Sequence, residues 1–127
     1  YVRKIVQAVQ GEEFLVIYHN CGNSVPQMLD GIYALGAAAY HFGNSIDMKA
    51  MLEKFPDDIP VMGNIDPAEV LRMGTPQMVR SKTLDLMKSC APYRNFVLSS
   101  GCDIPPLSPW TNLDAFFEAA EEYYASC

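Results

Sequence analysis

The sequence predicts an α/β fold in which four parallel strands alternate with helices. Four short apolar runs lack the polar alternation of a half-exposed strand, and such runs are typical of parallel strands buried on both faces. A segment with apolar residues at helical spacing follows each run. Each run also ends in glycine or polar residues, which indicates that the strand stops there.

Four such strand–helix units make either half of an eight-stranded barrel or a small open sheet. A complete barrel typically needs about 250 residues, and this chain has 127. We therefore predict a single half-barrel domain over residues 1–127, with exposed edge strands that either a homodimer of half-barrels or strand swapping would protect. Because the chain begins at Tyr1, we expect it to be a fragment of a longer protein.

The first strand follows a short helix. Apolar residues at helical spacing predict this helix over residues 1–10, and Gly11 ends it. The apolar run 14–18 predicts the first buried strand. A helix over 26–35 follows, started by Ser24 and Pro26. Its predicted inward side chains are Met28, Leu29, Ile32, Tyr33 and Leu35.

The second and third units are shorter. The run 37–42 predicts the second strand, and residues 47–55 predict a short helix with Pro56 beyond its end. The third strand is predicted over 59–62. One or two helical turns over 67–73 follow it.

A long helix is predicted before the fourth strand. Thr75 and Pro76 are a typical helix start, and the helical spacing continues to about Cys90. The run 95–98 predicts the fourth strand, and Ser108-Pro109 starts the last helix. Its predicted inward side chains are Leu113, Phe116, Phe117, Ala120 and Tyr124.

Charge and composition exclude several classes of function. The formal net charge is −6 and lysines and arginines do not cluster, which argues against a nucleic-acid partner. No apolar run reaches the length of about 18 residues that a membrane helix requires. No leader sequence is visible, so we expect a cytoplasmic protein with no membrane partner. In that compartment the four cysteines are predicted to be free thiols, some of them serving a metal.

A His-x-Cys pair follows the first predicted strand. Side chains two residues apart on a strand point the same way, so His19 and Cys21 are expected on one side. Cys102 is the only other cysteine that directly follows a predicted strand, and ligands of such sheets bind at the carboxyl ends of the strands. One histidine and two cysteines leave a fourth position open for substrate, as in a catalytic zinc site.

Each candidate also has a plainer interpretation. His19 alone is compatible with a core histidine, and Cys21 alone with a small buried apolar residue. Asn64 and Asp47 are the candidate catalytic residues, although Asp47 could equally cap its helix. Asp66 is predicted mainly to cap the next helix. His41, inside the second predicted strand, is predicted to be structural.

Four phrases of this sequence resemble the uroporphyrinogen decarboxylase superfamily. They are His-Asn-Cys-Gly-Asn at 19–23, Gly-Asn-Ile-Asp-Pro at 63–67, Gly-Thr-Pro at 74–76 and Ser-Gly-Cys-Asp-Ile-Pro-Pro at 100–106. More narrowly, they resemble its cobalamin-dependent branch, which includes the methylcobamide:coenzyme M methyltransferases. The resemblance covers nearly the whole chain and implies the carboxyl-terminal half of a TIM (β/α)8 barrel.

The cysteines favour the methyltransferase branch of this superfamily. Its His-x-Cys…Cys zinc motif is matched by His19, Cys21 and Cys102. True decarboxylases instead have a histidine, in a Gly-His-Gly setting, where Cys102 stands, and they lack the His-x-Cys pair. Their arginines and catalytic aspartate belong to the amino-terminal half, which has no counterpart here.

The resemblance implies a zinc-dependent transfer of a methyl group. Zinc would bind and deprotonate a thiol, which would take the methyl group from a corrinoid carried by a partner protein. The methyl donor, the acceptor and the fourth zinc ligand stay open. Two alternatives also stay open: a decarboxylase acting on a tetrapyrrole, and an inactive fragment or non-catalytic metal-binding or interaction domain.

Overall fold

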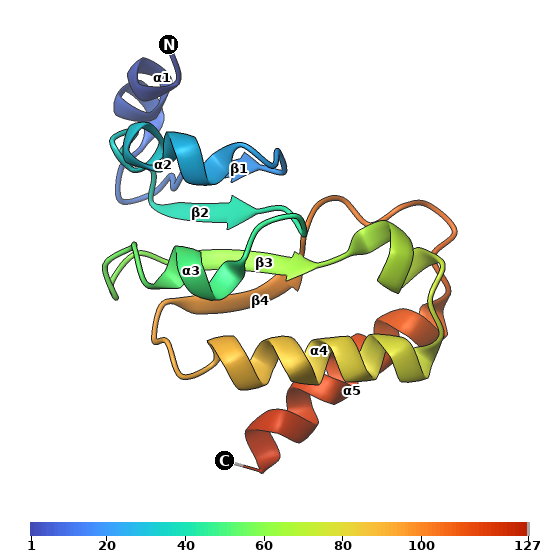
Figure 1. Cartoon of the computed structure of the whole chain (residues 1–127). Helices are drawn as coiled ribbons and strands as arrows, with labels where there is room; N and C mark the ends of the chain where they lie inside the picture. Colours follow the sequence, from blue (N-terminus) through green and yellow to red (C-terminus); the bar gives the residue numbers. More distant parts are fainter. Residues whose placement is uncertain (127) are drawn as a thin grey trace.

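The computed structural model describes residues 1–126, which contain one four-stranded parallel sheet (Figure 1). The strands lie in the order β1-β2-β3-β4, so each is next to the one that precedes it in the chain. Their bounds are Ile17–Asn20 for β1, Ala39–Phe42 for β2, Val61–Ile65 for β3 and Phe96–Ser100 for β4. All three pairings are parallel. The predicted α/β class with four parallel strands and intervening helices is confirmed.

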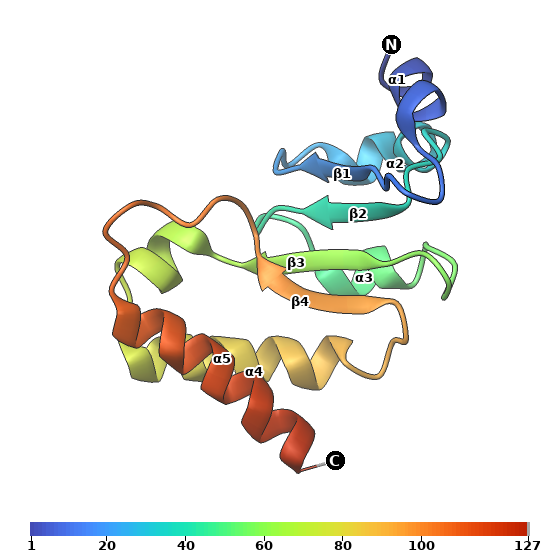
Figure 2. The same cartoon turned by 180° about the vertical axis from the view of Figure 1, so that it is seen from behind.

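Helices connect the strands and precede and follow the sheet. They are α1 (Val2–Val9), α2 (Val25–Tyr33), α3 (Met48–Leu52), the π-helix η1 (Pro67–Arg72), α4 (Pro76–Cys90) and α5 (Trp110–Ala125). All four strand arrows point toward the same side of the molecule in Figure 1. Seen from behind, β2 and β3 lie in front of α3, and no helix of residues 1–126 covers them on that side (Figure 2). Within these residues no helix has the length and apolar character needed to span a membrane.

Side-chain caps fix the starts of three helices at the carboxyl edge of the sheet. Asp47 accepts a hydrogen bond from the Ala50 amide and thereby caps α3. Asp66 accepts from two amides in the first turn of η1, and Thr75 accepts from the Met78 amide at the start of α4. The predicted capping roles of Asp66 and Thr75 are confirmed, because each satisfies amides that have no partner within their helix.

The main core lies between the sheet and the helices α2 and α3. Tyr40 and Phe42 of β2 and Val61 of β3 are fully buried there, against Leu29 and Met51. These side chains project from one face of the strands, since alternate residues point to opposite faces. A second cluster, at the carboxyl end of β3, joins η1, α4 and α5.

The first strand differs from the prediction of a buried strand over 14–18. It runs from Ile17 to Asn20 and is an edge strand that pairs only with β2. Phe14, Leu15 and Ile17 are all more than half exposed. The run was wrongly predicted as buried, because no further strand of the described residues pairs with β1 on this side.

The third and fourth strands extend further toward their carboxyl ends than predicted. Asn64 pairs with Ser99 and Ile65 with Ser100, although the predicted strands stopped at residues 62 and 98. Glycine and polar residues at these positions predict strand ends. The ladder to the neighbouring strand satisfies their backbone groups, so the strands continue through them.

The inward face of α5 also differs from the prediction. Phe117 and Tyr124, predicted to face inward, are 63% and 61% exposed, whereas Asn112, Ala115 and Ala119 are buried. The two alanines allow close packing on this side. The Asn112 amide donates to the carbonyls of Leu71 and Gly74, so it is a buried polar residue with partners. A similar correction holds for α2, where Met28 and Tyr33 are exposed.

Candidate metal site

The structure brings His19, Cys21 and Cys102 together. One ligand atom from each of them lies within 4.8 Å of the other two, and the group could hold a metal ion. Nε2 of His19 lies 3.6 Å from Sγ of Cys102, although the two residues are 83 positions apart. His19 and Cys21 are exposed and Cys102 is half-buried, so small molecules can reach all three.

His19 and Cys102 could not come this close merely by lying at the carboxyl ends of parallel strands. β1 and β4 are the two outer strands, so a flat sheet would separate them by three strand spacings, about 14 Å. Contacts beyond the strand tips shorten this separation. The His41 ring of β2 donates a hydrogen bond to the Ser100 carbonyl of β4, and the Gly101 amide donates one to the Ile65 carbonyl of β3. The end of β4 therefore reaches across β3.

Two glycines allow the loops to approach each other. A Cβ added to Gly101 would lie 2.6 Å from the backbone nitrogen of Asn44, and one added to Gly43 would lie 2.6 Å from Cα of Cys21. Any larger residue would push these backbones apart, because the obstructing atoms belong to the main chain. Gly43 therefore fits beside Cys21, and Gly101 precedes Cys102. The sequence showed both glycines, but their neighbours only became visible in the structure.

The donor set and its spacing fit a zinc ion. Imidazole nitrogen and thiolate sulfur are preferred zinc ligands, at about 2.0 and 2.3 Å from the ion. At a tetrahedral angle these bond lengths place nitrogen and sulfur about 3.5 Å apart. The separation of His19 from Cys102 is 3.6 Å. The other two separations of the group are within 4.8 Å, at most about 1 Å beyond the sulfur–sulfur distance of about 3.8 Å expected around zinc.

His41 lies next to the candidate ligands. Its register partner on β1 is His19, and the two ring centroids are 4.6 Å apart with a 34° angle between the ring planes. Nε2 of His41 donates to the Ser100 carbonyl at 2.7 Å, which requires a proton on that nitrogen. Sequence reasoning predicted His41 as structural and did not place it beside His19.

The candidate catalytic residues Asn64 and Asp47 have structural partners. The Asn64 amide donates to the carbonyls of Gly43 and Ile46 at 2.9 and 2.7 Å and thereby holds the loop after β2. The Asp47 carboxylate caps α3 and is exposed. These contacts give each residue a role in the fold, while their catalytic roles stay predictions.

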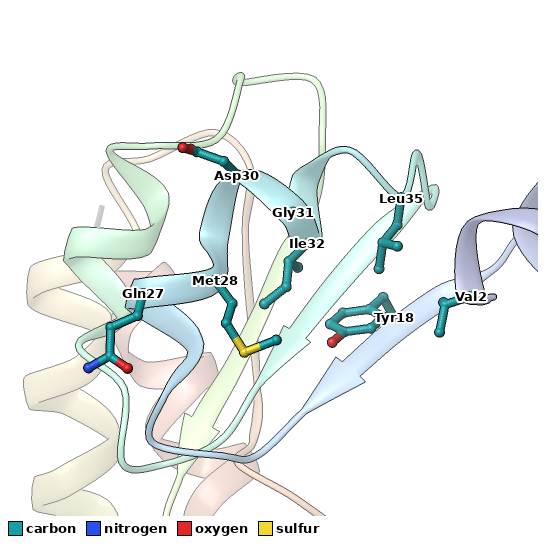
Figure 3. A pocket seen from close by; sticks show the side chains of 8 residues that line it. All are labelled: Val2, Tyr18, Gln27, Met28, Asp30, Gly31, Ile32 and Leu35. Carbon is teal, nitrogen blue, oxygen red and sulfur yellow. The ribbon is translucent and has the colours of Figure 1, made fainter.

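An apolar hollow lies apart from the candidate ligands. It has a volume of about 460 Å³ and lies between α1, α2 and β1 (Figure 3). Met28, Ile32 and Leu35 point toward the ring of Tyr18, whereas Asp30 turns away from it (Figure 3). Tyr18 and His19 are consecutive in a strand, so the hollow lies on the opposite face of β1 from His19.

The cysteines of the described residues are free thiols, as predicted. Cys90 is buried at the end of α4, and burial raises the pKa of its thiol. It is therefore separate from the candidate site, where Cys21 is exposed. Cys127 lies outside the described residues.

Comparison with known proteins places these features in one family. A family model described as uroporphyrinogen decarboxylase (URO-D) matches residues 1–123. The methylcobamide:CoM methyltransferases MtbA of Methanosarcina acetivorans and Methanosarcina mazei are 29% and 28% identical to the chain, and each match covers 97% of it. A uroporphyrinogen decarboxylase of Prochlorococcus marinus is 38% identical over 77 residues, which is 61% of the chain and 21% of that protein.

A solved structure supports the fold. A methyltransferase from Methanosarcina mazei matches 97% of this chain with a TM-score of 0.81 and 22% sequence identity. This likeness confirms that the four strand–helix units correspond to part of a TIM barrel. The chain spans about one third of the length of that structure and of the MtbA proteins, 34% in each case.

Proposed function

The chain belongs to the uroporphyrinogen decarboxylase family, and we propose that it forms part of a zinc-dependent methyltransferase. The enzyme would move a methyl group between a corrinoid carried by a partner protein and a thiol or related acceptor. The observation that carries this proposal is the convergence of one imidazole and two thiols at the carboxyl ends of β1 and β4, within 4.8 Å of each other.

The accessibility of the site supports transfer chemistry over a purely structural metal. Structural zinc sites are closed by four protein ligands, whereas catalytic sites have three and leave one position open. Three candidate ligands are found among the described residues, and two of them are exposed. Within the described residues, a fourth position therefore stays open for a thiol substrate.

A bound zinc ion would supply a positive charge that lowers the pKa of a substrate thiol, so that the thiol would be ionised at neutral pH. In the transfer itself, the thiolate sulfur would form a bond to the methyl carbon while the cobalt–carbon bond breaks, and the cobalt would keep the electron pair. The chain would contribute the orientation. His19 and Cys21 project from the tip of β1 and Cys102 from the loop after β4, so they define one side of the reaction space.

The names of the relatives support this choice without deciding it. The two proteins that match 97% of the chain are described as methylcobamide:CoM methyltransferases, and we extend that chemistry to the protein containing this chain. A uroporphyrinogen decarboxylase is more identical, 38%, but over only 77 residues. We therefore retain decarboxylation of a tetrapyrrole as the second candidate function.

Metal analysis and methyl transfer by the full-length protein test the proposal. We expect about one zinc per chain and transfer from methylcobalamin to a thiol such as coenzyme M. Cys102→Ser should remove both the metal and the activity, because a serine hydroxyl is a poor zinc ligand at neutral pH. The matched control is Cys90→Ala, which removes a buried thiol outside the site and should leave the zinc content unchanged.

Three results would contradict the proposal. Full methyl transfer by metal-free protein would show that the three residues do not act through zinc. Release of carbon dioxide from uroporphyrinogen, without methyl transfer, would establish the second candidate function instead. Stable zinc binding without either reaction would favour the third possibility, a non-catalytic metal-binding or interaction domain.

A further inference from the structure

We propose that His41 is a positioning residue that sets the spacing between His19 on β1 and Cys102 after β4. This inference rests on the proposed metal site. It concerns a residue that contributes no atom to the group of candidate ligands but contacts both of the strands that carry them. The reason lies in two contacts that His41 makes in opposite directions.

The first contact orients the ring of His19. β1 is an edge strand, and His19 is exposed at its tip. Such a side chain would otherwise turn about its χ angles with little restriction. The His41 ring lies beside it on the neighbouring strand, with centroids 4.6 Å apart. This contact limits the directions in which Nε2 of His19 can point.

The second contact fixes the end of β4. Nε2 of His41 donates to the Ser100 carbonyl at 2.7 Å, across the intervening strand β3. The Ser100 hydroxyl in turn donates to the Cys102 carbonyl at 2.7 Å. A chain of two hydrogen bonds therefore connects His41 to the backbone of Cys102.

Both contacts are needed for one function. A metal ion gains most from ligands that are already in place, because otherwise binding must also order them. Groups that orient metal ligands typically change metal affinity about 10- to 100-fold when they are removed. Histidine combines a flat ring with an N–H donor, so one side chain can hold His19 on one side and Ser100 on the other.

Three substitutions in the full-length protein separate the two contacts. His41→Ala removes both, His41→Phe retains the ring, and His41→Gln retains an N–H donor. Co²⁺ is the probe, because the absorption bands of Co²⁺ report tetrahedral coordination and thiolate ligation directly. Affinity is measured by competition with a chromophoric chelator.

The control is Tyr40→Phe, on the same strand but on the opposite face. Its hydroxyl bonds to the Ala37 amide and the Tyr33 carbonyl, inside the core. We expect this variant to unfold more easily, with an unchanged Co²⁺ spectrum and affinity. His41→Ala should instead lower the affinity about 10- to 100-fold and alter the spectrum, with partial recovery in the Phe and Gln variants.

The outcomes distinguish this inference from the proposed function. If the wild-type protein binds Co²⁺ through His19, Cys21 and Cys102 and His41→Ala binds it equally well with the same spectrum, the positioning role is wrong while the metal site stands. Equal losses in His41→Ala and Tyr40→Phe would also overturn it, because only stability would be involved. If the wild-type protein binds no metal, both proposals fail.

Discussion

The two edges of the sheet, β1 and β4, have different surroundings, although residues at the end of each strand are candidate metal ligands. At the β1 end the edge strand is open, and Ile17 is 54% exposed. At the β4 end the strand leads into helices that pack closely, with Ala115 and Ala119 of α5 buried. The ligands therefore come from two edge strands, of which only β4 leads into closely packed helices.

The loops at the strand tips show the same contrast. After β4, the Gly101 amide donates to Ile65, and Ser100 is held by His41 and bonds to Cys102. After β1, the Asn20 side chain accepts from the Gly22 amide in an exposed local turn. The difference indicates that Cys102 is held in place by the fold, whereas His19 and Cys21 depend on fewer contacts.

The largest expected effect comes from Gly101→Val, which would remove the anchoring of the β4 end. The new Cβ would meet the Asn44 backbone at 2.6 Å. We expect a loss of about 3 kcal/mol or more in the free energy of unfolding, together with loss of metal binding. Urea denaturation and metal analysis measure both.

The control for this change is Gly31→Ala in α2. No atom lies within 4 Å of the added Cβ, and alanine favours a helix over glycine by about 1 kcal/mol. We expect a slight gain in stability. If Gly101→Val unfolded like the wild type, the close approach of the two loops would be wrong.

Thiol alkylation compares the exposed Cys21 with the buried Cys90. The thiolate is the reacting form, and burial raises the pKa of the Cys90 thiol. We expect iodoacetamide at pH 8 to modify Cys21 about 100-fold faster than Cys90, since Cys90 reacts only after local opening. Peptide mass spectrometry resolves the two sites. Comparable rates would contradict the burial of Cys90.

The raised pKa of Cys90 also predicts how stability changes with pH. The unfolded chain ionises this thiol at a lower pH than the folded chain does. The buried neutral thiol of Cys90 therefore contributes fully to the free energy of unfolding below the ordinary thiol pKa of about 8.5. This contribution is lost as the pH rises through the raised pKa that Cys90 has in the folded chain. A pH series of denaturation curves, with Cys90→Ala as the comparison, measures this loss.

The same substitution in two asparagines compares the two sides of the molecule, since Asn112 lies in α5 and Asn20 in β1. Asn112→Ala would leave the buried carbonyl of Leu71 and the partly buried carbonyl of Gly74 without their donor, at an expected loss of about 2 kcal/mol. Asn20→Ala would remove only exposed or half-exposed hydrogen bonds, with an expected loss below about 1 kcal/mol. Chemical denaturation of both variants tests the difference, and a larger loss for Asn20→Ala would reverse the comparison.

The smallest expected effect is that of Ile17→Thr on the open edge. Threonine also favours strands, and the side chain is 54% exposed, so the free energy of unfolding should change by no more than about 0.5 kcal/mol. Thermal denaturation measures the change. A loss of about 2 kcal/mol would instead show that a further strand, or a second copy of the chain, covers this edge.

The sequence predicted the order of strands and helices well, because that order is encoded locally. Apolar periodicity and helix caps such as Thr75 depend on residues a few positions apart. The same local reasoning failed where burial depends on what lies beyond an element. It wrongly predicted Phe117 and Tyr124 as inward residues of α5 and the run 14–18 as buried.

By itself, then, the sequence determined the alternation of strands and helices and the presence of a His-x-Cys pair and a later cysteine at strand ends. Only the tertiary structure decided that His19 and Cys102, 83 positions apart, lie 3.6 Å from each other. It also decided that Gly43, Gly101 and His41 surround them. The physical reason is that such contacts depend on how far the loops after outer strands reach across a sheet, and residue spacing along the chain does not encode that reach.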